Sequence, residues 1–68
     1  MPSKLEIKKL RVRNEFSLLK ERFHSMNVRF EVEHPTGSMI STEKNCDFLL
    51  EMFRSTNQAL DKLLSCKK

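Results

Sequence analysis

Few side chains in this sequence could take part in catalysis or bind a metal ion. The chain has two histidines, His24 and His34, and two cysteines, Cys46 and Cys66. Neither histidine has a cysteine or carboxylate at a spacing typical of a zinc site. No sequence motif surrounds either cysteine to indicate a nucleophile, and the single glycine, Gly37, excludes a glycine-rich phosphate loop. We therefore expect no enzyme activity, no metal, no cofactor and no small-molecule substrate.

The cysteines and the N-terminus indicate a compartment. Both cysteines fall in one predicted helix and are separated by about 30 Å of helix rise, so they cannot form a disulfide with each other. The N-terminal stretch MPSKLEIKK lacks the apolar run of a signal peptide. The longest apolar runs are two or three residues, so we expect no membrane span. These features favour a soluble intracellular protein, cytoplasmic or nuclear.

The chain is basic, with a net charge of +4 from 13 Lys and Arg against 9 Asp and Glu. Such a charge permits binding to nucleic acid or to an acidic partner without requiring it. Four basic residues fall on one flank of the first predicted helix: Lys4, Lys8, Arg11 and Arg22. This flank could follow a phosphate backbone. Alternatively, the alkyl stems of these side chains cover the edge of a hydrophobic seam.

Two long helices are predicted from apolar periodicity. Ser3 and Glu6 have the spacing of a capping box, and we expect the first helix at about 4–26. Ser41 or Thr42 can cap the second helix, expected at about 43–65. The apolar stripes of the two helices are formed by Leu5, Val12, Phe16, Leu19, Phe23 and Met26 in the first, and Cys46, Leu49, Phe53, Leu60 and Leu63 in the second.

Between the helices, the apolar period changes from helical to alternating. Val28, Phe30 and Val32 alternate with charged residues, which is typical of a strand with one buried face. Pro35 and Gly37 suit a type I turn closed by a bulge. We therefore expect a β-hairpin at about 28–42. The predicted fold class is α+β: a single α-β-β-α domain over residues 1–68, with an antiparallel helix pair and a two-stranded hairpin between the helices.

Some apolar residues fall outside the predicted core. Ile7, Leu10 and Leu18 lie within one quadrant of the first helix, away from its main stripe, and Phe48 lies off the stripe of the second. A chain this short has a marginal core, so a second apolar face indicates a partner. We predict a small protein-interaction or assembly module that uses Ile7, Leu10 and Leu18 to self-associate or to dock on a larger protein. The alternative is a small nucleic-acid-binding or regulatory protein using Lys4, Lys8, Arg11 and Arg22.

Overall fold

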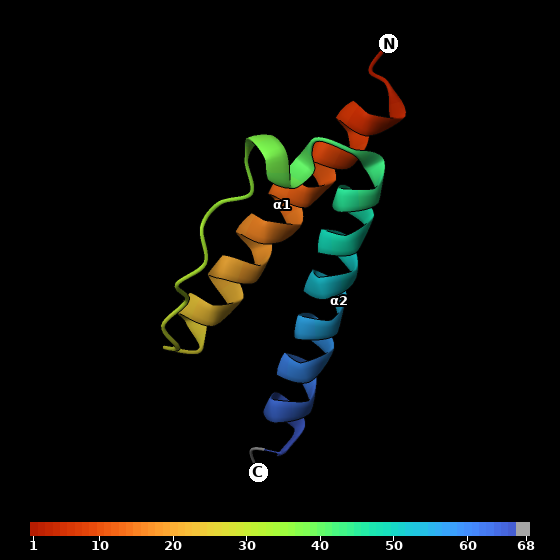
Figure 1. The fold of residues 1–68 in the computed structure, drawn as a ribbon. Coiled ribbons are helices and arrows are strands. Elements are labelled where there is room, and N and C mark those ends of the chain that lie inside the picture. The colour runs from red at the N-terminus through yellow and green to blue at the C-terminus, as the bar shows by residue number, and fades with distance from the viewer. Residues whose placement is uncertain (67–68) are drawn as a thin grey trace.

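A computed structural model describes residues 1–66 of the chain as a small helical domain built from two long helices packed against each other. Helix α1 spans Lys4–Ser25, a short 3-10 helix η1 spans Gly37–Ile40, and helix α2 spans Glu43–Cys66 (Figure 1). The backbone N–H of Glu6 donates a hydrogen bond of 3.2 Å to the Ser3 hydroxyl at the start of α1. Thr42 accepts an equivalent bond of 3.1 Å from the N–H of Asn45 at the start of α2. Each helix therefore begins at a side chain that satisfies one of its free N–H groups.

The predicted β-hairpin is wrong, because residues 1–66 contain no strand. Residues 28–36 are extended but unpaired, and Gly37 begins the 3-10 helix. Gly37 does adopt a positive φ of 54°, but it serves the entry to η1 and not a hairpin turn. The alternating apolar residues do not form one buried face. Only Phe30 packs against the core, whereas Val28 and Val32 are 45% and 56% exposed. Without a second strand to pair with, the alternation does not produce a sheet with one buried side.

The predicted antiparallel helix pair is also wrong, because α1 and α2 run in the same direction (Figure 1). Near the first end of the pair, Lys8 forms an ion pair of 2.9 Å with Asp47. Near the other end, Arg22 forms one of 2.7 Å with Asp61. Both pairs join residues 39 positions apart. Because the difference in residue number between the partners is the same near both ends of the packed helices, the two helices must be parallel.

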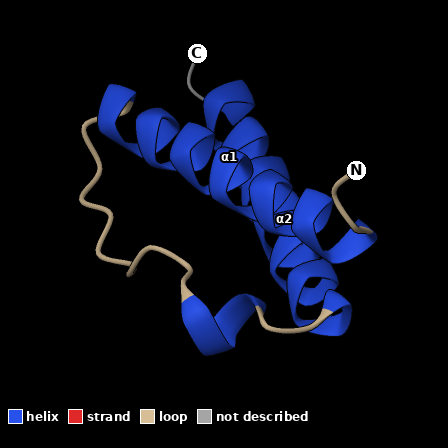
Figure 2. Ribbon diagram, turned by 90° about the horizontal axis from the view of Figure 1, so that it is seen from above, coloured by secondary structure: helices blue, strands red, loops and turns tan. Residues whose placement is uncertain are grey.

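The length of the connection explains this direction. Residues 26–42, which we call the return segment, must carry the chain from the end of α1 back to the level of its start. Helix α1 is about 33 Å long, and an extended chain covers that distance in about ten residues. An antiparallel pair would need only a short turn. Figure 2 shows the return segment as a separate arc beside the two helices.

The return segment forms the third side of the core. Its Pro35 and Ile40 are buried, and Phe30 packs against the core from the edge. The ring of Phe16 lies at the centre, with ring centroids 5.6 Å from Phe30 and 6.1 Å from Phe53 of α2. The ring of Phe23 stacks on Phe30 at 4.7 Å. The buried apolar residues of the core are Val12, Phe16, Leu19, Ile40, Cys46, Phe53 and Leu60.

The central position of Phe16 gives a first prediction. Replacing Phe16 by Ala should lower the free energy of unfolding by about 3–5 kcal/mol, because it removes the ring that joins all three segments. Such a loss is enough to unfold most of a domain this small. The measurement is urea denaturation followed by circular dichroism. As a control, Leu18→Ala on the exposed side of α1 should change the free energy of unfolding by less than about 0.5 kcal/mol. Equal effects of the two changes would contradict this description of the core.

Candidate protein-interaction surfaces

The predicted interface residues lie outside the core on α1. Ile7, Leu10 and Leu18 are 48%, 55% and 57% exposed. We call them the outer face of α1. They project from the same quadrant of the helix, opposite its buried stripe. Leu18 also borders a shallow groove that includes Leu64 of α2. The structure thus leaves these three side chains uncovered.

A second exposed apolar surface lies on α2. Phe48, Met52 and Leu63 are 65%, 48% and 58% exposed, and with Ala59 between them they form what we call the outer face of α2. Apolar periodicity predicts Leu63 on the buried stripe, but this prediction is wrong, because Leu63 is one of the more exposed residues of the helix. Helix α2 therefore carries apolar side chains on two sides, and α1 with the return segment covers only one.

The distribution of charge on α2 could have revealed this second face from the sequence. At about 100° per residue, all the charged residues of the helix fall within an arc of about 100°. They are Glu43, Lys44, Asp47, Glu51, Arg54, Asp61 and Lys62. An amphipathic helix that buries one stripe normally carries charge around most of the remaining circumference. An uncharged arc this wide indicates that a second side of α2 is apolar.

The four basic residues predicted to contact nucleic acid fall into two groups. Lys8 and Arg22 are only about one-third exposed and bridge α1 to α2. The Arg22 guanidinium also donates a hydrogen bond of 2.7 Å to the Asn57 side-chain oxygen. Lys4 and Arg11 are exposed and form no ion pair with a described residue. Half of the predicted basic flank therefore connects the two helices.

The groove beside Arg11 is electrostatically mixed. It runs between α1 and α2 and is lined by Arg11 and Arg54 together with Glu15, Asp47 and Glu51. Three carboxylates line it together with two basic side chains, so it is not a basic track of the kind that follows a phosphate backbone.

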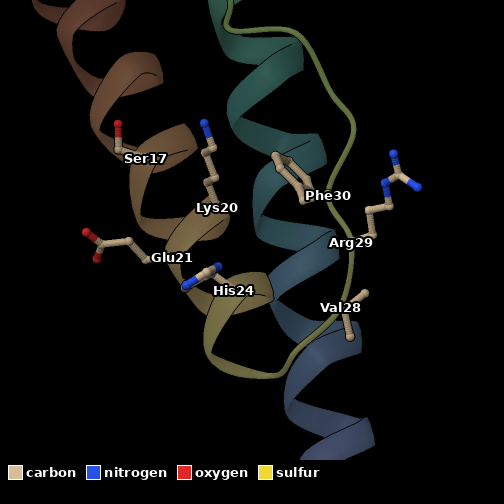
Figure 3. Close-up of a pocket in the computed structure, with 7 residues that line it drawn as sticks. All are labelled: Ser17, Lys20, Glu21, His24, Val28, Arg29 and Phe30. Carbon is tan, nitrogen blue, oxygen red and sulfur yellow. The ribbon is translucent and has the colours of Figure 1, made fainter.

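A further groove of about 530 Å³ lies between the end of α1 and the start of the return segment (Figure 3). Its polar side chains do not converge. Glu21 and Arg29 point toward opposite sides of the view, and Arg29 forms an ion pair of 2.8 Å with Glu31. A ligand site usually brings several polar groups toward one point, so this groove lacks the arrangement of a small-molecule site. The residues lining it are Ser17, Lys20, Glu21, His24, Val28, Arg29 and Phe30.

The titratable residues of the chain do not gather into a metal site in the described part. Among residues 1–66, no three His, Cys, Asp or Glu side chains come close enough together to hold a metal ion. Cys46 is buried, and Cys66 is exposed at the end of α2. His34 lies edge-on against Phe16, with ring centroids 5.1 Å apart.

Among the residues described, no helix combines the length and the apolar character needed to cross a membrane.

Comparisons with known protein families, with curated proteins and with solved structures found no match. The function must therefore be inferred from the surfaces of this chain itself.

The ion pairs of Lys8 give a prediction for the pH dependence of stability. The hydrogen bond to Asp47 is the main cause that raises the pKa of Lys8 above its usual value of 10.5, and the charges of Asp47 and Glu43 add to it. The protonated form therefore stabilises the folded state. This stabilisation is complete below pH 10.5 and is lost as the pH rises through the raised pKa of the folded state.

We expect Lys8→Met to be less stable than the wild type near about pH 8, and the difference to shrink above about pH 11. Urea denaturation at both pH values measures it. Lys4→Met is the matched control, because Lys4 contacts no carboxylate of the described residues. A Lys8→Met defect that is the same at both pH values would show that the alkyl stem, and not the charge, stabilises the fold.

Proposed function

We propose that this chain is a small non-enzymatic interaction or assembly module that acts by packing an exposed helix face on a partner protein, most directly on a second copy of itself. The observation that carries the proposal is the pair of uncovered apolar faces, one on α1 and one on α2. Each contains three large apolar side chains that are about half exposed or more. Monomeric proteins rarely leave two such faces in water.

The dimensions of the molecule support this proposal. The chain exposes 5521 Å², whereas a folded monomer of 8.1 kDa is expected to expose about 4,500 Å². Its radius of gyration is 13.4 Å, against about 11 Å for a compact domain of this length. The excess of about 1,000 Å² is similar to the roughly 800 Å² that each partner contributes to a stable protein interface.

The thin core supports it further. Only seven apolar residues form the buried cluster, and neither a disulfide nor a metal site reinforces it within the described residues. Domains of this size usually need an additional source of stability, and association is one of the common sources. Burial of one of the exposed faces in an assembly would supply it.

The nucleic-acid alternative stays a prediction with less support. Lys8 and Arg22 are occupied by interhelical ion pairs, and the groove beside Arg11 also contains carboxylates. Within residues 1–66, only Lys4 and Arg11 of the predicted set form no ion pair. We also propose an intracellular location, cytoplasmic or nuclear, which suits a chain whose buried thiol at Cys46 is unpaired.

If the chain self-associates, its stability should depend on its own concentration. Raising the concentration from about 5 µM to about 500 µM should increase the melting temperature by about 5–10 °C, because mass action favours the assembled, folded state. Sedimentation velocity over the same range should show a rising weight-average mass. A wild-type chain that sediments as a monomer throughout, with an unchanged melting temperature, would contradict self-association.

A further inference from the structure

We propose that the outer face of α2 pairs with the same face of a second copy, so that two α2 helices pack antiparallel around a two-fold axis near Thr56. This inference rests on the proposed function and specifies the partner, the surface and the orientation. The outer face of α1, with Ile7, Leu10 and Leu18, stays outside this contact.

The outer face of α2 has the composition of a helix–helix seam. It continues along the helix without a charged residue, and Phe48, Met52 and Leu63 provide its large apolar side chains. The residues near the middle of this face are small: Ser55, Thr56 and Ala59. The Thr56 hydroxyl donates a hydrogen bond of 2.9 Å to the Met52 carbonyl of its own helix. The polar group of Thr56 is thus already satisfied. Small residues at the middle of a face allow two helices to approach closely there.

The shape of this face also fits a facing helix. A shallow hollow of about 320 Å³ lies on it, lined by Phe48, Glu51, Met52, Ser55 and Thr56. The first four of these residues occupy positions i, i+3, i+4 and i+7. That is the spacing of the four residues that form a hole for a knob side chain from a packed helix. With the axis near Thr56, the segment Ala59–Leu63 of the second copy lies level with the hollow.

The flanking charges favour the antiparallel orientation. Glu51 and Lys62 lie on the same flank of the outer face. In an antiparallel pair, equivalent flanks of the two helices meet. Glu51 of one copy then lies level with Lys62 of the other, and the two-fold axis generates a second identical pair. A parallel arrangement would instead place Glu51 against the uncharged flank of the second copy.

The available area suits a second copy as the occupant. The overlap of two α2 helices about this axis extends over nearly the whole of Glu43–Cys66, or about 30 Å. Because the face is complementary to itself in both apolar contacts and charge, no other protein is needed to cover it.

The first test compares two exposed apolar residues on different helices. Phe48→Glu should weaken self-association at least about tenfold in sedimentation equilibrium, because the two-fold axis places one buried charge in the apolar seam toward each end of the contact. Leu10→Glu, at a similarly exposed site on α1, should leave association within about twofold of the wild type. Circular dichroism checks that both variants stay helical. If Leu10→Glu dissociates the wild-type assembly and Phe48→Glu does not, the proposed function stands but the α2 contact is overturned.

The second test reverses the flanking charges. Glu51→Lys and Lys62→Glu should each weaken association about threefold, because each places like charges across the contact. The double variant Glu51→Lys with Lys62→Glu should restore it. Residues 51 and 62 are too far apart to pair within one helix, so restoration would report a contact between copies. Additive losses in the double variant would overturn the antiparallel register.

The third test determines orientation with a short bifunctional thiol crosslinker. In the antiparallel pair the two Cys66 side chains are about 30 Å apart, so the wild-type dimer should not crosslink. Ser55→Cys in a Cys66→Ser background lies near the two-fold axis and should crosslink efficiently. Efficient crosslinking through Cys66 itself would show a parallel pair and overturn the orientation. A wild-type chain that is monomeric at every concentration would overturn both this inference and the self-association it rests on.

Discussion

The contacts of the Phe16 ring hold together the three segments of this domain. The ring packs on Phe30 and His34 of the return segment and on Phe53 of α2. Neither helix could bury its stripe fully on the other, because a pair of helices in contact shields only one side of each. The return segment closes the remaining side near Phe16, so an irregular segment completes the core where a β-sheet or third helix does so in most small domains.

The parallel direction of α1 and α2 follows from the same arrangement. A chain that lays its connection along α1 must start α2 at the level where α1 started. Two ion pairs then join residues that are equally far apart in the sequence, Lys8 with Asp47 and Arg22 with Asp61. Such partly exposed pairs contribute little to stability, typically below about 1 kcal/mol each. Their main effect is to fix the register of the two helices, since a shift by one turn would separate both pairs.

A core completed by an extended segment stays thin, and this explains the exposed faces. The return segment is narrower than a helix and covers only the side of the pair around Phe16. The outer faces of α1 and α2 therefore keep large side chains such as Leu10 and Phe48 in contact with water. The resulting molecule is 46 Å long and less than half as wide. This shape suits a subunit that gains its remaining stability from a partner.

The sequence by itself determined the two helices, their capping residues and most of the buried stripe, because periodicity and capping are local properties of the chain. It also indicated that Ile7, Leu10 and Leu18 lie off the core. It could not separate an unpaired segment from a hairpin, since pairing with a second strand is a long-range contact that the local alternation around Phe30 does not determine. Three other features depend on contacts between residues that are 35 or more positions apart in the sequence. They are the direction of α2, the exposure of Leu63 and the ion pairs of Lys8 and Arg22 between the helices. Only the tertiary structure decided them, because many long-range pairings satisfy the same local pattern and the packing around Phe16 selects one.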